Sequence, residues 1–445
     1  MASLLVAQSL PAQAPTPTPP PRLDQDALDF RGRSSLTGGS GARALGMGGA
    51  FLARADDATA ASWNPAGLSY LRLPELSVVF VGSALDTVHR EIDLAIARDE
   101  TGTSIAPDFI ALTIPYERGV VSGAAQLSFQ RAFSFDGNRD IADCRALRPQ
   151  GCRSLAQAED FVRSSIDGSG GFDLFALATG VRLAHRLRIG ASLNRWTHGY
   201  TQTRSRRLFN PSVQHTQFEL SGWNANLGVI WSPLDNLNLG VVGKTPFTAG
   251  VDLWRARTDL VETEGQGEPR AFTNGFRGDD VRLKLPGAVG TGVSWRPRSN
   301  LMFSADYTRT FWSEARIYDF FVVSVRSEAE PRRFESLRYP ELEAREQRDT
   351  EEMRFGTEYV FVGQRFSWPI RAGYFLDRQH FLAADDKAPH FWGFSAGAGI
   401  LRGPILFDVA YVRETGRYPA ANAGSIKVAL DRLYASVIYR YPRRP

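Results

Sequence analysis

The chain has 445 residues, a net charge of +4, 43% hydrophobic and 22% charged residues, and 41 Gly, 28 Phe, 13 Tyr and 9 Trp. Its apolar runs are far shorter than the about 18 residues that a membrane-spanning helix needs. Its small basic excess lacks the basic helix or aromatic motif of a nucleic-acid binder. The composition favours β structure, and a closed barrel is then the one way to cross a bilayer, because backbone polar groups must pair inside the protein.

The N-terminus precedes any predicted strand. Residues 1–14 read MASLLVAQSLPAQA, with a short apolar stretch and an Ala-x-Ala ending, and we expect them to be a signal peptide remnant. The basic region of a signal is missing, so either the start codon is misassigned, which we favour, or this is not a signal. Residues 15–37 contain PTPTPPP and are predicted to be a Pro-rich linker.

Residues 38–72 are too rich in small side chains for a lipid-facing strand. Gly46, Gly48 and Gly49 would permit close backbone approach and positive φ. The run Asn64, Pro65, Ala66 and Gly67 is a turn signal. We expect a hatch that packs tightly inside the barrel; the alternative is a loop before the first strand.

From Glu75 onward, segments of about ten residues alternate apolar and polar positions, which is typical of strands with one apolar face. Residues 301–312 show the pattern, with Leu301, Phe303, Ala305, Tyr307 and Phe311 opposite Ser304, Asp306, Thr308 and Thr310. We predict about fourteen strands over residues 73–445. Tight links (117–119, 184–186, 232–236, 296–300, 401–403) alternate with long ones (86–106, 134–171, 258–279, 314–350, 416–429), as in bacterial outer-membrane barrels.

Tryptophans support this placement. Those beside short turns are Trp231, Trp295 and Trp368, and those toward long links are Trp254, Trp312 and Trp392. They predict two aromatic girdles. The alternative is that they are core aromatics of a soluble all-β protein.

The two cysteines, Cys144 and Cys152, lie in one polar stretch, where a disulfide would close a small loop in an oxidising compartment. The free thiols are the equally weighted alternative. The six His are scattered, so no metal site of known spacing is expected, and no cofactor.

Three stretches resemble the long-chain fatty acid transporter (FadL) family of outer-membrane hydrocarbon transport proteins. The first is the Gly-rich segment followed by Asn64-Pro65-Ala66, which is similar to that family's N-terminal hatch. The second is Leu285-Pro286 with the strand ending DYTRTFWS, and the third, weaker one is IRAGYFLD at 370–377. The resemblance implies a fourteen-stranded barrel plugged by a hatch, with passive uptake of fatty acids or aromatic hydrocarbons and lateral release through the wall.

Several residues are candidates for this route. Arg282, Lys284, Asp306 and Glu358 are predicted lumen residues that could contact a ligand or the hatch, although a salt-bridged interior is the commoner role. Phe320 and Phe321 lie in an unusually apolar stretch that could form a groove wall, or could extend a strand. Small residues weaken strand pairing, so Gly123 and Ala124 mark a candidate lateral opening.

Two other functions are compatible with a barrel fold. An enzyme would need a facing nucleophile and base, and no such pair is evident, so no catalytic residue is expected. A secretion-associated shuttle or structural barrel remains the alternative to uptake, because fold does not fix function. The expected location is the bacterial outer membrane, and the expected partners are a hydrophobic small molecule, outer-membrane lipid and lipopolysaccharide, and the barrel assembly machinery.

Overall fold

The computed structural model describes residues 38–91, 96–119, 121–144, 162–206, 212–261, 270–324, 335–343, 348–420 and 424–442. All belong to the compact unit Gly32–Pro445. The predicted signal remnant and linker, residues 1–37, lie outside the described residues. Among the described residues no helix is long and apolar enough to cross a membrane.

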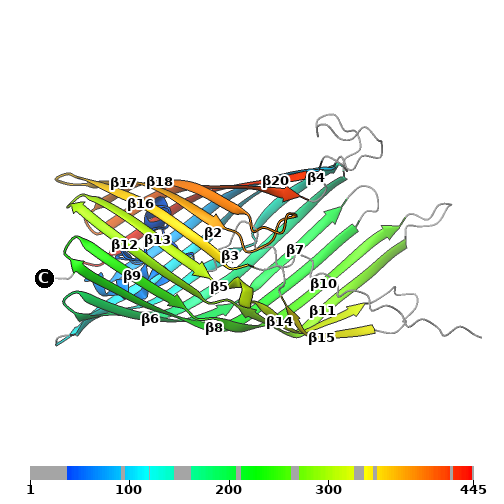
Figure 1. Ribbon diagram of the computed structural model, residues 1–445, viewed down its shortest axis with the longest axis horizontal. Coiled ribbons are helices and arrows are strands. Elements are labelled where there is room, and N and C mark those ends of the chain that lie inside the picture. Colours follow the sequence, from blue (N-terminus) through cyan, green and yellow to red (C-terminus); the bar gives the residue numbers. More distant parts are fainter. Residues whose placement is uncertain are drawn as a thin grey trace, which may run out of the picture. The chain divides into compact units, whose positions relative to one another are not determined.

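The described chain is dominated by one antiparallel sheet that follows three short helical segments (Figure 1). The helical segments are α1 (Ala42–Gly46), α2 (Ala60–Trp63) and η1 (Pro65–Tyr70), and η3 (Trp312–Glu314) lies between two strands. The strands are β1 (Glu75–Glu91), β2 (Ile96–Arg118), β3 (Val121–Ser134), β4 (Gly137–Cys144), β5 (Val162–Ala184), β6 (Leu187–Thr197), β7 (Gly199–Arg206), β8 (Ser212–Leu234), β9 (Leu237–Lys244), β10 (Phe247–Val261), β11 (Arg270–Leu285), β12 (Ala288–Arg298), β13 (Leu301–Thr310), β14 (Arg316–Ser324), β15 (Glu335–Glu343), β16 (Thr350–Val362), β17 (Ser367–Arg378), β18 (His390–Arg402), β19 (Ile405–Ala420) and β20 (Gly424–Arg440).

The sheet closes on itself, because β1 pairs with β2 on one side and with β20 on the other. Its twenty strands make fourteen wall strands of the ring, because in six cases two consecutive strands follow one another along the same wall position. These pairs are β3 with β4, β6 with β7, β9 with β10, β11 with β12, β13 with β14, and β15 with β16. Closure of the ring pairs the first strand with the last, so that the sheet has no free outer edge strand at β1 or β20. The prediction of an all-β antiparallel barrel of about fourteen strands is confirmed.

The barrel carries apolar side chains outward and polar ones inward. On β8, Trp223, Leu227 and Trp231 are 54%, 60% and 49% exposed, whereas the alternate residue Asn226 is buried. On β13, Phe303 is exposed and Asp306 is buried. An apolar band of this kind on the outer surface is stable only against lipid, and the architecture is that of an outer-membrane barrel.

Several segments that lack hydropathy alternation, and that we predict as long links, are largely paired strand in the structure. The β1–β2 ladder runs to Glu91 and Ile96, and the β10–β11 ladder runs to Val261 and Arg270. Hydropathy alternation marks only the part of a strand that meets lipid, so paired strands that continue beyond the apolar band lack the signal.

Five of the six tryptophans assigned to the predicted girdles are exposed on the described barrel. Trp231, Trp295, Trp368, Trp254 and Trp392 are between 44% and 49% exposed. Trp312 is buried and stacks on His380 with ring centroids 4.5 Å apart. The expectation that Trp312 joins the outer girdle is wrong, because it belongs to η3, where the strand alternation has already ended.

Residues 38–72, here called the lumen segment, lie inside the ring. Its helix α1 contacts β17 to β20, whereas η1 contacts β3, β5, β6 and β8 across the barrel. Figure 1 shows it in blue within the strands. A segment that touches opposite walls occupies the cross-section of the barrel.

Candidate functional site

The glycine-rich start of the lumen segment folds as a tight, buried chain. Gly48 and Gly49 have φ of +66° and +76°, a region that favours glycine. The hydroxyl of Ser395 on β18 accepts a hydrogen bond from Gly48 N (2.8 Å) and donates one to Gly46 O (3.0 Å). The backbone of the segment is therefore bonded directly to the wall.

The turn that follows is centred on a fully buried asparagine. Asn64 Oδ1 accepts from Ala66 N at 3.1 Å, and Asn64 Nδ2 donates to Leu52 O at 2.9 Å and to Val229 O of β8 at 3.2 Å. Pro65 begins η1, where its missing N–H costs nothing. Gly67 lies so close to Ala55 that a Cβ would stand 1.9 Å from its carbonyl oxygen. One amide side chain thus joins both halves of the segment to the barrel.

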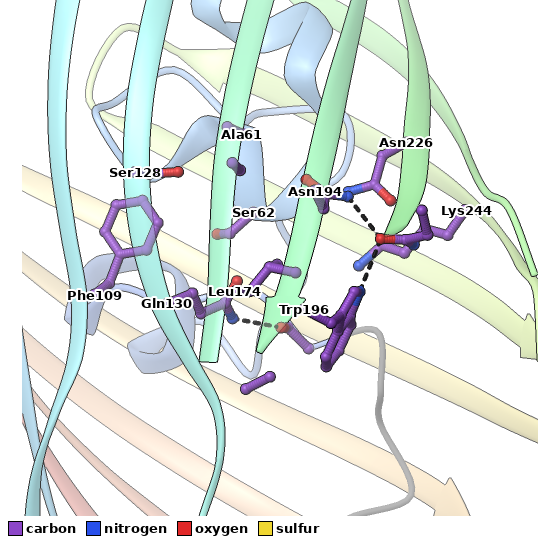
Figure 2. A pocket seen from close by; sticks show the side chains of 14 residues that line it. Ala61, Ser62, Phe109, Ser128, Gln130, Leu174, Asn194, Trp196, Asn226 and Lys244 are labelled. Atoms are coloured by element: carbon purple, nitrogen blue, oxygen red, sulfur yellow. Dashed lines mark hydrogen bonds between the residues drawn. The ribbon is translucent and has the colours of Figure 1, made fainter. Parts of the chain in front are cut away.

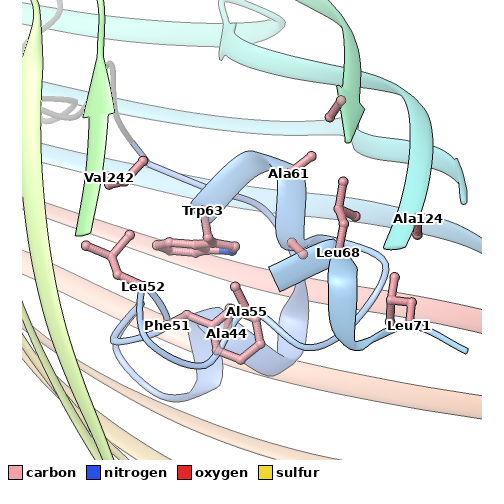
Figure 3. Close-up of a cluster of buried hydrophobic side chains, with 12 residues drawn as sticks. Ala44, Phe51, Leu52, Ala55, Ala61, Trp63, Leu68, Leu71, Ala124 and Val242 are labelled. Carbon is pink, nitrogen blue, oxygen red and sulfur yellow. The ribbon is translucent and has the colours of Figure 1, made fainter. Parts of the chain in front are cut away.

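The interior of the lumen segment is a small hydrophobic core (Figure 3). Phe51 and Trp63 meet edge to face with centroids 6.1 Å apart, and Ala124 of β3 and Val242 of β9 close the cluster from the wall. Ala124 is fully buried. The segment therefore folds together with the barrel wall as one core.

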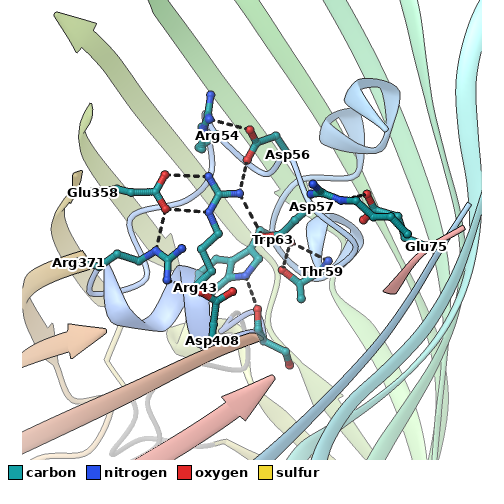
Figure 4. Close-up of polar contacts among 12 residues, drawn as sticks. Arg43, Arg54, Asp56, Asp57, Thr59, Trp63, Glu75, Glu358, Arg371 and Asp408 are labelled. Atoms are coloured by element: carbon teal, nitrogen blue, oxygen red, sulfur yellow. Dashed lines mark hydrogen bonds and ion pairs between the residues drawn. The ribbon is translucent and has the colours of Figure 1, made fainter. Parts of the chain in front are cut away.

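Charged groups tie the same segment to the opposite wall (Figure 4). Arg43 Nε and Nη2 each lie 3.0 Å from the carboxylate of Glu358 on β16, and Arg43 Nη1 lies 2.8 Å from Asp56. Arg371 on β17 bonds Glu358 at 2.7 Å and Asp408 at 2.6 Å. Burial lowers the pKa of Arg43, but the surrounding carboxylates outweigh it and raise that pKa well above its usual value, so the guanidinium stays charged.

A second carboxylate holds the middle of the segment. Asp306 Oδ2 on β13 accepts hydrogen bonds from Phe51 N at 2.6 Å and Leu52 N at 2.8 Å. Asp306 and Glu358, two of the candidate lumen residues, are both buried and bind the lumen segment.

The wall approaches the segment closely where it carries glycine. A Cβ at Gly373 of β17 would lie 2.0 Å from Gly48 N, and one at Gly190 of β6 would lie 2.3 Å from Pro65 C. Neither position could hold a side chain without displacing backbone. Glycine in these strands is explained by close backbone approach.

A cavity of about 150 Å³ lies between the lumen segment and the wall. Its apolar lining comprises Leu45, Trp63, Val81, Phe133, Phe375, Val412, Leu430 and Tyr434. This volume matches that of an engineered apolar protein cavity that binds benzene. The cavity is therefore large enough for a small hydrophobic molecule.

A second space, of about 30 Å³, adjoins the first, and Gly38, Gln130 and Ala132 line both (Figure 2). Its lining includes several polar side chains: Asn194 Nδ2 and Trp196 Nε1 donate to Asn224 Oδ1 at 3.0 Å and 2.9 Å, and Gln130 Nε2 donates to Gly38 O at 3.1 Å. A polar space of this size suits a water molecule. Of these two spaces, the larger has the volume for a small apolar ligand.

The larger cavity reaches an interruption in the barrel wall. The β2–β3 ladder ends at Phe109 opposite Gln130, and pairing with the same strand resumes only where Thr103 meets Asn138 on β4. Ser104 and Asp108 line the cavity from one edge of this interruption, and residues 131–134 line it from the other. The cavity therefore borders the interrupted part of the wall on both edges.

Gly123 and Ala124, the predicted site of a lateral opening, lie in an uninterrupted part of the wall. Gly123 and Ala124 are paired on both sides, with Tyr116 and Pro115 of β2 and with Val181 and Gly180 of β5. The prediction of an opening at Gly123 and Ala124 is therefore wrong; the interruption lies in the same wall strand, about one third of the strand further along. These two small residues serve packing: a Cβ at Gly123 would lie 2.2 Å from Gly180 O.

The remaining candidates lie away from the cavity. Arg282 is exposed, and Lys284 lies 3.4 Å from Glu314, whereas their neighbours Val281 and Leu283 are buried, so the predicted lumen placement of this pair is wrong. Phe320 and Phe321 lie on β14, but their side chains are outside the described residues. Cys152 is also outside them, so the predicted disulfide with Cys144 stays a prediction. Within the described part of the chain, no group of three His, Cys, Asp or Glu side chains could hold a metal ion.

Known proteins of solved structure share this fold. A FadL homologue of Pseudomonas aeruginosa has 13% identity and a TM-score of 0.59, with 91% of this chain and 99% of that chain covered. The toluene transporter TbuX of Ralstonia pickettii has 15% identity and a TM-score of 0.57, over 91% and 99%. The toluene transporter TodX of P. putida has 13% identity and a TM-score of 0.60, over 92% and 100%.

No family model matches the chain, and no curated protein matches it by sequence. The structural likeness nevertheless extends over the whole of each solved chain and includes the closed barrel. The chain therefore has the fold of a FadL homologue and of the toluene transporters TbuX and TodX, that of an outer-membrane β-barrel.

Proposed function

We propose that this chain carries neutral hydrophobic small molecules across the outer membrane. The observation that carries the proposal is the cavity of about 150 Å³ that borders both the lumen segment and the β2–β3 interruption. A ligand taken into it from outside would leave sideways into the lipid. Burial contributes about 0.8 kcal/mol per CH₂, so contact with the apolar side chains in the lining would favour binding of such a ligand.

The lumen segment supports a lateral route. It is fixed to opposite walls by Asn64, by Asp306 and by the Arg43–Glu358 pair, and these contacts bury its polar groups. In this proposal it acts as a hatch that stays in place, and the domain plan of a hatch (38–72) inside a barrel (73–445) is part of it. Water-soluble solutes would be excluded, while an apolar solute needs no aqueous pore.

The charges around the cavity favour a neutral ligand over a fatty acid. The lining has three arginines and three carboxylates: Arg131, Arg354, Arg432, Asp108, Asp377 and Glu414. Arg354 already pairs with Glu352 at 2.7 Å, and Arg432 with Glu414 at 2.7 Å. A ligand carboxylate that bound Arg354 or Arg432 would have to displace Glu352 or Glu414. The displaced carboxylate would then be buried without a cation. Small aromatic hydrocarbons fit both the volume and the balanced charge.

Uptake of labelled toluene and of labelled oleate into cells, with and without the protein, tests the proposal. Val412→Trp would fill the cavity, because Val412 lines it and is buried. Val409→Trp is the matched control, since Val409 is on the same strand but faces outward and is 36% exposed. We expect the protein to speed toluene uptake, Val412→Trp to abolish the gain, and Val409→Trp to keep it.

The other outcomes separate the alternatives. Faster uptake of oleate than of toluene would contradict the argument from charge. Uptake unaffected by Val412→Trp would contradict the assignment of this cavity. A correctly inserted barrel that speeds neither solute would favour the secretion-associated shuttle, and its cargo would then be sought by copurification.

A further inference from the structure

The outer surface of the barrel is hollowed over four neighbouring wall strands, β12, β13, β16 and β17 (Figure 1). The hollow, here called the outer groove, has a volume of about 600 Å³. Clefts that bind small molecules typically measure about 300–1,000 Å³. The outer groove is therefore large enough to hold part of a lipid.

Two pairs of aromatic side chains form the sides of the outer groove. Trp295 lies opposite Phe303, and their rings stack with centroids 6.1 Å apart. Phe355 lies opposite Tyr374 on the next two strands. All four are between 42% and 49% exposed, so they stand on the surface that faces lipid.

Small side chains form the floor between these two pairs. Ala305 lies opposite Phe355, whereas Thr357 lies between Phe303 and Ala372 in the register. Each of the two rows across the strands thus has aromatic side chains at one end of the groove and small ones at the other. The result is a depression that runs diagonally between the aromatic pairs.

The floor is apolar and firmly supported from inside. Thr357 Oγ1 donates to Met302 O at 3.0 Å, so its hydroxyl is already bonded within the wall. Gly356 also lines the groove, and a Cβ there would lie 2.3 Å from Met47 O of the lumen segment. The wall backbone therefore rests directly on the lumen segment. A groove that is formed before binding costs little ordering when it is filled.

The outer groove lies in the half of the membrane next to the short turns. Trp295 and Trp368, beside these turns, are 49% and 47% exposed. Tyr374 is six residues from Trp368 on β17, which is about 20 Å along the strand and about 15 Å of depth at the usual tilt. The hydrocarbon core is about 30 Å thick. Since short turns face the periplasm, the groove belongs to the periplasmic leaflet.

Arginines stand at the end of the groove nearest the turns. Arg298 and Arg365 are exposed on two short turns, and Val360 N donates to Asn300 O at 2.9 Å between the strands that carry them. Among the described residues, neither arginine has a hydrogen-bond or ion-pair partner. Residues 295–303 and 361–368 contain no Asp or Glu. This end of the groove therefore favours an anion.

We infer that the outer groove binds one anionic phospholipid of the periplasmic leaflet, with an acyl chain between the aromatic pairs and the phosphate at Arg298 and Arg365. The depth of the groove excludes lipopolysaccharide, which occupies the other leaflet. Guanidinium groups bind phosphate oxygens with paired hydrogen bonds. An apolar surface alone would suit any lipid or a second barrel, and the two arginines favour an anionic headgroup. This site is separate from the cavity at the lumen segment.

Native mass spectrometry of the whole protein tests the inference, after extraction from vesicles of equal phosphatidylglycerol and phosphatidylcholine. We expect one phosphatidylglycerol per barrel to be retained, with at least tenfold preference over phosphatidylcholine. Each arginine near a lipid surface strengthens binding of an anionic lipid about fivefold. The double variant Arg298→Gln, Arg365→Gln should therefore lose most of the preference.

Arg118→Gln combined with Arg186→Gln is the matched control for charge. Both arginines are exposed on other short links, so the control removes the same net charge from the same end of the barrel. It should leave the preference unchanged. Loss of preference in this control to the same extent would show that the whole rim attracts anionic lipid, and would overturn the site.

Ala305→Trp tests the groove itself, because the new ring would fill its floor. We expect retained lipid to fall about tenfold, whichever headgroup it carries. Ala191→Trp on β6 is the control: Ala191 is also half-buried and faces outward, since its neighbour Ser192 is buried and a Cβ at Gly190 would meet Pro65. It should retain lipid as the unchanged protein does.

Three results would overturn the inference: equal retention in the Ala305 and Ala191 variants, equal retention of the two lipids by the unchanged protein, or a dimer that Ala305→Trp dissociates. The last would assign the groove to a second copy of the chain. Retention of lipid does not depend on what the barrel transports. A protein that binds phosphatidylglycerol as expected but never speeds toluene uptake would support this site and contradict the proposed function alone.

Discussion

Arg43 and Glu358 form a two-point ion pair, with Nε–Oε2 and Nη2–Oε1 distances of 3.0 Å each, although 315 residues separate them in the chain. Both side chains are about nine-tenths buried, at 11% and 7% exposed. Glu358 also pairs with Arg371, so this one carboxylate forms ion pairs with an arginine of the lumen segment and with an arginine of the wall.

Glu358→Gln should therefore destabilise the folded barrel strongly. Removal of one partner of a buried ion pair leaves uncompensated charge and typically costs about 3–5 kcal/mol. The free energy of unfolding in urea, followed by tryptophan fluorescence in vesicles, measures the loss. Glu314→Gln is the control, since Glu314 is 53% exposed beside Lys284, and an exposed pair contributes about 0–1 kcal/mol. Equal losses in the two variants would contradict the role of Glu358.

Asn64→Ala should loosen the lumen segment more than it destabilises the barrel. The change removes bonds to Leu52 O, Val229 O and Ala66 N, at a cost of about 1–3 kcal/mol for each buried group left unsatisfied. We expect protease to cleave the segment faster in the folded barrel. Asn194→Ala, which removes one partly buried hydrogen bond to Asn224 within the wall, should leave cleavage unchanged. Resistance of the Asn64 variant to protease would show that the turn is held by other contacts.

Gly373→Ala should displace the lumen segment and open a path for water. The new Cβ would stand 2.0 Å from Gly48 N, and overpacking of this kind typically costs about 1–3 kcal/mol. Ion conductance of single barrels in a planar bilayer should rise. The matched control is Gly243→Ala, where no atom lies within 4 Å of the added Cβ. Unchanged conductance in the Gly373 variant would mean that the wall yields and the segment stays.

The barrel itself could be predicted from sequence because lipid imposes a period of two on each strand. Val121, Leu127 and Phe303 are exposed and Gln126 and Ser304 are buried, as alternation predicts. The alternation changes phase at one interruption of a wall strand. At Pro286 and Gly287, between β11 and β12, the inward positions change from odd to even, with Leu283 and Leu285 inward before and Ala288 inward after. For this reason Arg282 and Lys284 were predicted on the wrong face.

The site was less predictable than the fold. Asp306 and Glu358 were found because a carboxylate in an apolar alternation must face inward, but no spacing rule links Glu358 to Arg43. The interruption was missed because it depends on the bond from Gly170 N to Asp136 and on the register shift at Phe80, both of which require the strands to be paired first. Pro107 was the one local signal, since proline within a strand marks an unpaired edge.

The paired extension of β10 and β11 beyond the apolar band should be dispensable. Thr258 lies opposite Thr273, and the ladder continues from there to Val261 and Arg270. Deletion of residues 259–272 and insertion of Asn-Gly between these threonines would close the hairpin with a two-residue turn, whose twist suits antiparallel strands. Because the extension is not part of the cavity lining, we expect unchanged toluene uptake and a melting temperature within a few degrees of the original. Reduced uptake by a shortened barrel of unchanged stability would instead place the initial capture of the ligand on this hairpin.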